Sequence, residues 1–205
     1  MAGAREEIER EIQSWCERGD LLAAATAAIR GYGPEIFGLL LALHRDHDHA
    51  SDVFSIFSED LWKGIGHFAW QCSFRTWAYT LARNASCRYR KNERKRAHDI
   101  PLSLVTSISA IQAEARSETS PHLRSDNKRR IEKLREELSE EDQTLLILRV
   151  DKELAWSDLA RVMLGERDLS ADEAELKRES ARLRKRFQLI KERLVELGRK
   201  EGLLR

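Results

Sequence analysis

Apolar residues recur three and four positions apart along most of the chain, and at this spacing side chains share one face of an α-helix. Strict alternation of apolar and polar residues, the mark of a half-buried strand, is scarce. In the first part of the chain the pattern predicts an alanine-rich helix capped by Asp20 and interrupted at 32–34. Two further helices are expected over 35–43 and 51–62.

A longer helix is predicted within the segment CSFRTWAYTLARNASCRYRKNERKR, residues 72–96. One of its faces begins apolar and becomes cationic, along Phe74, Trp77, Leu81, Asn84, Arg88 and Lys91. Glu93 is the one acid among its basic residues, which are Arg75, Arg83, Arg88, Arg90, Lys91, Arg94, Lys95 and Arg96. Such a run repels itself without a polyanionic partner, so it predicts phosphate binding. The alternative is a solvated helix end.

Aromatic residues precede this helix in a loop that follows Gly64 and Gly66. Phe68 and Trp70, with Gln71 beside them, are candidates to stack on unpaired bases of a nucleic acid. The alternative is that both rings cover the core, which is the role expected for Trp77.

The second half of the chain predicts a separate helical block. Residues 102–127 are rich in Ser, Thr and Ala and read as an extended linker. Helices are then expected over 131–138, after an N-cap at Ser139, over 155–164 and over 172–199. We therefore predict an all-α chain with two helical domains, 1–98 and 128–205, joined by a flexible linker over 99–127.

The last two helices resemble a helix-turn-helix, with a connection starting at Gly165. Outside its apolar stripe the final helix carries Lys177, Arg178, Arg182, Arg184, Lys185 and Arg186 within about three turns. Its early turns would enter a major groove, where Arg bonds guanine and Ser180 contacts a base or phosphate. The alternative is an ordinary amphipathic helix with a charged back.

Composition narrows the function classes. Charged residues make up 35% of the chain and the net charge is +1, so the basic segments are offset by acidic ones elsewhere. The apolar runs fall short of the ~20 residues of a membrane span, and the acidic N-terminus is no secretory signal. Three widely spaced cysteines fit free thiols in the cytoplasm.

Catalytic and metal motifs are not found in the sequence. No phosphate-binding glycine loop, nucleophile elbow or zinc-protease helix occurs, so we expect no enzyme and no cofactor. His44, His47 and His49 lie close together, but no cysteine pattern completes a zinc site. We expect them in a solvated loop, with no metal bound.

Several segments resemble the extracytoplasmic-function (ECF) group of the bacterial sigma-70 family. SFRTWAYTLARN (73–84) and the basic run after it are similar to the end of that family's region 2, and ASDVFSIFSEDLW (50–62) to its preceding helix. LSEEDQTLLILRV (138–150), ELAWSDLARVML (153–164) and RLRKRFQLIKERL (182–194) are similar to its region 4. The resemblance covers about 35–98 and 128–200.

The resemblance implies a sigma factor that directs promoter-specific initiation with core RNA polymerase. Region 2 would dock on the clamp helices of the largest subunit through Asp52, Ser55, Ile56, Glu59 and Trp62. Its loop would capture a base of the minus-ten element, and its basic helix would guide the DNA strands. Region 4 would read the minus-thirty-five element and meet the polymerase flap. Many relatives are held inactive by an anti-sigma factor.

Three positions depart from the family's pattern. Ser55 and Ile56 stand where the family often has Gln-Glu, and Arg88 stands where it often has Asp. Two other classes remain open: a stand-alone helix-turn-helix regulator, which would bind duplex DNA alone, and a helical adaptor that binds only protein.

Overall fold

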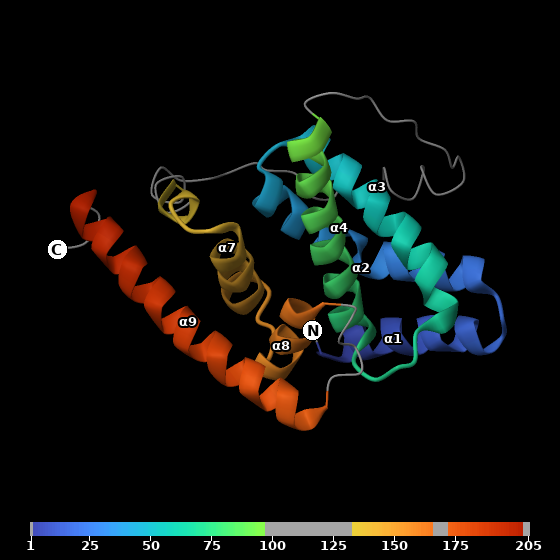
Figure 1. Cartoon of the computed structure of the whole chain (residues 1–205). Coiled ribbons are helices and arrows are strands. Elements are labelled where there is room, and N and C mark those ends of the chain that lie inside the picture. Colours follow the sequence, from blue (N-terminus) through green and yellow to red (C-terminus); the bar gives the residue numbers. More distant parts are fainter. Residues whose placement is uncertain (1, 97–132, 166–171, 203–205) are drawn as a thin grey trace. The chain divides into compact units, whose positions relative to one another are not determined.

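The computed structural model describes residues 2–96, 133–165 and 172–202, and these form helices joined by short connections (Figure 1). The described residues contain no β-strand, which confirms the all-α fold class. The chain divides into two compact units, Met1–Ser120 and Pro121–Arg205. The predicted linker over 99–127 lies outside the described residues.

The described part of the N-terminal unit contains the helices α1 (Ala2–Glu17), α2 (Leu21–His44), α3 (His47–Gly64) and α4 (Phe74–Arg96). Helix α2 is central, because α1, α3 and α4 all pack against it, and α3 also packs against α4. A short 3-10 turn, η1 (Ile65–His67), follows α3. The core is formed by side chains that are at most 1% exposed, among them Ile12, Phe37, Phe54, Phe57, Leu61, Phe74 and Tyr79.

Helix α2 runs without a break through Pro34, so the predicted interruption at 32–34 is wrong. A proline inside a helix removes one backbone hydrogen bond and crowds the preceding turn. Tyr32, Ile36 and Phe37 around it are all buried, and their packing keeps both halves of the helix in line. The start of the helix was predicted correctly, since the Asp20 side chain accepts a hydrogen bond from the Ala23 amide at 2.9 Å.

Helix α3 begins four residues before the predicted start at Ser51. Its N-cap is Asp46, whose carboxylate accepts a hydrogen bond from the His49 amide at 2.8 Å. His47 and His49 therefore belong to the first turn of a helix, and the expected solvated loop is wrong for them. Both side chains are exposed.

The C-terminal unit contains α7 (Glu140–Leu146), a π-helical turn η2 (Ile147–Asp151), α8 (Trp156–Leu164) and α9 (Glu173–Lys200). Helices α7 and α8 both pack against α9. The predicted N-cap Ser139 is confirmed, because its Oγ accepts a hydrogen bond from the Asp142 amide at 3.2 Å. The core of this unit is formed by Leu145, Leu148, Leu159, Val162 and Leu183.

Helix α9 begins one residue after Asp172, whose carboxylate accepts a hydrogen bond from the Glu175 amide at 2.7 Å. Its predicted apolar stripe faces the unit's core, with Leu176, Leu183 and Ile190 buried. Within the ranges that the structure describes, no helix is long and apolar enough to cross a membrane.

Candidate nucleic-acid interface

Helix α4 passes from core to surface along the predicted face. Phe74, Trp77 and Leu81 are at most 3% exposed, whereas Arg88 and Lys91 are exposed. Asn84, between them, and Arg83 are half-buried. The first half of α4 therefore anchors the helix, and its later turns reach the solvent.

Arg75 does not lie on the exposed part of α4. Its guanidinium pairs with both carboxylate oxygens of Glu35 on α2, with an Nε–Oε2 distance of 3.1 Å, and its side chain is only 13% exposed. The guanidinium also lies 5.2 Å from the centre of the Tyr79 ring. Burial disfavours the charge, but Glu35 outweighs it and raises the pKa of Arg75. The charge of Arg75 is thus paired inside the unit, and its assignment as a DNA contact stays a prediction.

Two further arginines of α4 also have partners within the unit. Arg88 pairs with Asp60 on α3. Arg90 donates a 2.7 Å hydrogen bond to the carbonyl oxygen of Leu43, in the last turn of α2. The expected self-repulsion of the basic run is thus reduced, while Arg88 and Lys91 both remain exposed.

The aromatic rings of the loop pack against the buried aromatic rings at the start of α4. Phe68 stacks on Trp77 with ring centres 4.7 Å apart and planes at 17°, and it meets Phe74 edge-on at 5.6 Å. Trp70 lies 4.9 Å from Phe68 and has a φ of 56°, a left-handed conformation that a bulky residue rarely adopts. Phe68 and Trp70 are half-buried and Gln71 is exposed, so the loop covers the core and keeps part of its aromatic surface open.

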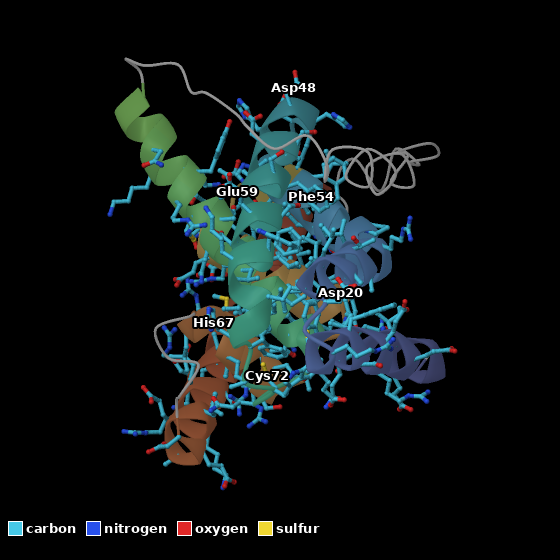
Figure 2. All side chains as sticks on the ribbon, turned by 90° about the vertical axis from the view of Figure 1, so that its right-hand side faces the viewer. Asp20, Asp48, Phe54, Glu59, His67 and Cys72 are labelled. Carbon is cyan, nitrogen blue, oxygen red and sulfur yellow. The ribbon has the colours of Figure 1, made fainter. Side chains whose placement is uncertain are left out.

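The outer side of α3 carries the five residues predicted to bind polymerase. Asp52, Ser55, Glu59 and Trp62 are exposed and Ile56 is half-buried. Glu59 and the buried Phe54 are labelled on this helix in Figure 2. Trp62 is 40% exposed and so offers apolar area on this side of the helix.

Five of the predicted DNA-binding residues of α9 are exposed: Lys177, Arg178, Arg182, Arg184 and Lys185. Two of these cations form ion pairs with glutamates of the same helix. Lys177 pairs with Glu173 at 2.7 Å, and Arg182 pairs with Glu179 through two hydrogen bonds of 2.7 and 2.8 Å.

Ser180 and Arg186 are placed differently from the prediction. Ser180 is only 6% exposed, and its hydroxyl donates a 3.1 Å hydrogen bond to the carbonyl oxygen of Trp156 on α8. Arg186 is half-buried and pairs with Glu141 and Asp142, with an Nε–Oδ1 distance of 2.6 Å to Asp142. Both side chains thus hold α9 against its neighbours, because the inward face of α9 extends further around the helix than the apolar stripe.

Trp156 is a residue that the sequence did not single out. Its ring lies under the guanidinium of Arg149 at 4.9 Å and that of Arg184 at 5.6 Å, and it meets Phe187 edge-on at 5.7 Å. Guanidinium groups favour this position over an indole ring. Trp156 thereby orients Arg184, one of the exposed cations of α9.

The histidine stretch forms no metal site in the structure. His44 Nε2 lies 2.8 Å from Ser86 Oγ, and burial, with Arg90 and His49 nearby, lowers the pKa of His44 to about 4. Across the described ranges, no group of three or more His, Cys, Asp or Glu side chains could hold a metal ion. Cys16 and Cys72 are half-buried free thiols, and Cys87 is an exposed one.

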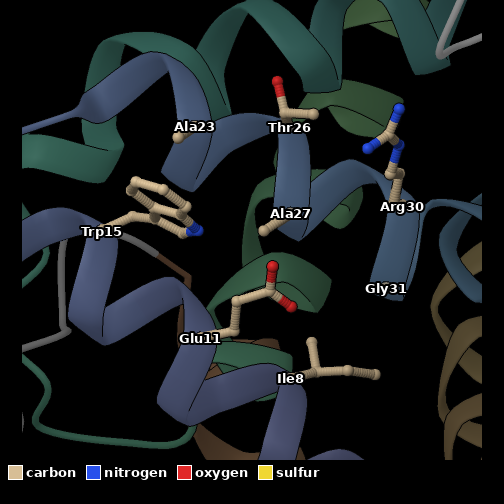
Figure 3. A pocket seen from close by; sticks show the side chains of 8 residues that line it. All are labelled: Ile8, Glu11, Trp15, Ala23, Thr26, Ala27, Arg30 and Gly31. Atoms are coloured by element: carbon tan, nitrogen blue, oxygen red, sulfur yellow. The ribbon is translucent and has the colours of Figure 1, made fainter.

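A cavity of about 390 Å³ lies between α1 and α2 (Figure 3). Its lining is mostly apolar, with the carboxylate of Glu11 on one helix and the guanidinium of Arg30 on the other. Trp15 and Ile8 of α1 complete that side. The contact between α1 and α2 is therefore hollowed on this side.

Comparison with known proteins identifies the part of the chain that carries the loop and α4. Residues 28–96 match the family model of sigma-70 region 2. No curated protein matches the sequence. Among solved structures, the chain is similar to the sigma factor RpoE in complex with the anti-sigma factor NepR from Bartonella quintana. The TM-score is 0.45 and the sequence identity 18%, over 78% of this chain and 91% of that chain.

The matched residues span most of α2 and all of α3 and α4, so these helices form a sigma-70 region 2 domain. This match agrees with the family predicted from the sequence for this part of the chain. The helices predicted as region 4 lie outside the matched residues.

Proposed function

We propose that the protein is an RNA polymerase sigma factor of the ECF group that directs promoter-specific initiation. The observation that carries the proposal is the region 2 match over 28–96, which contains the aromatic loop, the cationic end of α4 and the exposed side of α3. A sigma factor needs these three surfaces together, because melted DNA requires stacking and cations while polymerase requires a protein contact.

The outer side of α3 is the proposed contact with the clamp helices of the polymerase largest subunit. Trp62 supplies exposed apolar area there, and Asp52 and Glu59 supply negative charge. Ser55 and Ile56 complete the surface. Because they replace a pair that is often Gln-Glu in the family, the contact relies on apolar area more than on charge.

The loop and α4 are the proposed site for the minus-ten element. Phe68, Trp70 and Gln71 would meet an unstacked base, since aromatic rings stack on bases with little regard to sequence. The backbone of the melted strands would follow the exposed side of α4, near Arg83, Asn84, Arg88, Arg90 and Lys91.

The C-terminal unit is the proposed reader of the minus-thirty-five element, with a surface for the polymerase flap. The exposed cations in the first half of α9 support this role, since a cationic helix fits a major groove. Ser180 and Arg186 take no part, because both are bound within the unit. An anti-sigma factor is a further proposed partner, and the cytoplasm is the proposed location.

The test is to add the purified protein to core RNA polymerase and to run a genomic run-off transcription screen. We expect the protein to co-purify with core and to start transcription at a defined set of promoters. If a folded protein neither co-purifies with core nor starts transcription at any promoter, the proposal is ruled out. Tight binding to duplex DNA without core would instead indicate a stand-alone helix-turn-helix regulator, and binding to protein alone an adaptor.

A further inference from the structure

Glu9 on α1 connects three helices through one carboxylate oxygen. Its Oε1 accepts a 3.2 Å hydrogen bond from the hydroxyl of Tyr32 on α2 and another of 3.2 Å from the backbone amide of Arg75 on α4. Burial, together with Glu9, raises the pKa of Tyr32, so the hydroxyl keeps the proton that it donates. Helix α1 precedes the residues that match sigma-70 region 2.

The amide of Arg75 is one of the first amides of α4, which have no acceptor within the helix. A carboxylate there satisfies the amide and is stabilised by the positive end of the helix dipole. The neighbouring amide of Thr76 is satisfied locally, by Ser73 Oγ at 3.1 Å. The first turn of α4 is thus held by one residue of its own segment and by one residue from α1.

Arg75 is fixed from two sides. Its backbone is held by Glu9 of α1, and its guanidinium is held by Glu35 of α2. The preceding residue, Phe74, contacts the loop aromatics, with its ring 5.6 Å from Phe68 and 6.2 Å from Trp70. A shift of the Arg75 backbone would therefore move the rings that are proposed to meet the unpaired base.

Helix α1 packs closely on α2 and leaves a hollow beside the contact. Ile8 lies against the backbone at Gly31, where an added Cβ would come within 2.6 Å of Ile8 Cγ2, so the two helices touch closely there. Beside this contact lies the hollow between α1 and α2 (Figure 3). The two hydrogen bonds of Glu9 fix α1 more specifically, because one joins it to α2 and the other joins it to α4.

We propose that Glu9 is a positioning residue for minus-ten recognition, which fixes the start of α4 so that the Phe68–Trp70 loop is presented to melted DNA. This inference rests on the proposed function of the chain as a sigma factor. It assigns α1 a part in promoter opening, although α1 itself would touch neither DNA nor polymerase.

The test compares Glu9→Ala, Glu9→Gln and the matched control Glu7→Ala in the full-length protein. Glu7 is an exposed glutamate on the same helix. Three quantities are measured: hydrogen exchange of the Arg75 amide by NMR in the free protein, affinity for core polymerase, and promoter opening by permanganate reactivity of unpaired thymines.

For Glu9→Ala we expect Arg75 exchange to be faster by about ten- to a hundredfold, the range of one hydrogen bond to a charged group, and promoter opening to fall by a similar factor. Affinity for core should stay within about twofold of the wild type, because α3 is unchanged. Glu9→Gln should restore much of the loss, since its amide oxygen still accepts from both donors. Glu7→Ala should match the wild type.

Normal promoter opening by Glu9→Ala overturns the inference, and so does a parallel loss of core binding and opening, which would mean general unfolding. A wild-type holoenzyme that opens no promoter overturns the proposed function and this inference together. The two failures are distinguishable, because only the second affects the wild type.

Discussion

The guanidinium of Arg88 on α4 pairs with the carboxylate of Asp60 on α3. The Arg88 side chain is 51% exposed and the Asp60 side chain 22%, so the cation is open to solvent while its partner lies deeper. Burial raises the pKa of Asp60, although Arg88 acts in the opposite direction. A DNA phosphate that binds Arg88 would therefore compete with a carboxylate of the protein itself.

Asp60→Asn should strengthen promoter binding by the reconstituted holoenzyme, because Arg88 is released to a phosphate. The plot of log K against log salt concentration should become steeper by about 0.7–0.9, the change for one added phosphate contact. Asp48→Asn, which removes the same charge from the exposed first turn of α3, should leave the slope unchanged. An unchanged slope in Asp60→Asn would show that Arg88 does not reach DNA.

The stability of Asp60→Asn can be predicted from the same pair. Because burial raises the pKa of Asp60 above 3.8, the ionised group is less favourable in the folded than in the unfolded chain. This cost is present above the folded pKa and disappears as the pH falls through it. The substitution should therefore not destabilise the fold at neutral pH, so a change in DNA binding is not a consequence of unfolding.

Lys91→Ala tests the exposed end of α4 directly. Lys91 is exposed, so its removal should lower promoter affinity without changing the melting temperature. The salt slope should become shallower by about 0.7–0.9, the loss of one phosphate contact. A wild-type slope would place Lys91 on a solvated surface that DNA does not touch.

Arg75 and Glu35 should behave as a structural pair. Each of Arg75→Met and Glu35→Gln should lower the free energy of unfolding by about 2–4 kcal/mol, because each leaves a largely buried polar partner uncompensated. The double substitution should cost less than the sum of the two, which urea denaturation of all four proteins measures. A shallower salt slope in Arg75→Met, without loss of stability, would show that Arg75 is a DNA contact after all.

Ser180→Ala should destabilise the C-terminal unit by about 1 kcal/mol, the value of one buried hydrogen bond to a backbone carbonyl. The preference for bases in the minus-thirty-five element should not change, since Ser180 faces Trp156. Ser157→Ala, at an exposed position of α8, is the control for denaturation. If Ser180→Ala alters the base preference and keeps normal stability, Ser180 contacts DNA as first predicted.

The lowered pKa of His44 predicts how the stability of the fold depends on pH. Its pKa is lowered to about 4 in the folded chain, mainly by burial, whereas the ordinary value is 6.5. The unfolded chain therefore binds the proton more readily, and stability should fall as the pH falls from about 6.5 towards 4. His44→Gln, which cannot titrate but can still bond to Ser86, should flatten this part of the curve of melting temperature against pH. An equal slope in both proteins would contradict the prediction.

The sequence predicted the helices and their caps well, because both depend on neighbours in the chain. Asp20 and Ser139 were recognised as caps from residues within three positions, and the apolar stripe of α9 from its spacing. The interruption at Pro34 was wrong, since tertiary packing on both sides of the proline overrides the local preference.

The candidate site was less predictable than the fold. Arg75 and Arg88 looked like free cations because their partners, Glu35 and Asp60, lie on other helices. Helical spacing reveals a pair within one helix, such as Glu173 and Lys177, but it carries no information about which helices will meet. The hydrogen bond from Arg75 to Glu9 was hidden for the same reason.

The stack of Phe68 on Trp77 has a consequence for how the loop can be observed. The indole of Trp77 is 3% exposed, and Phe68 covers one of its flat sides. If Phe68 swings out to meet a base, water reaches that indole, and its fluorescence emission shifts to longer wavelength. In a variant that keeps Trp77 as its only tryptophan, the domain thus contains its own optical reporter of loop movement, which can be followed in real time without an attached dye.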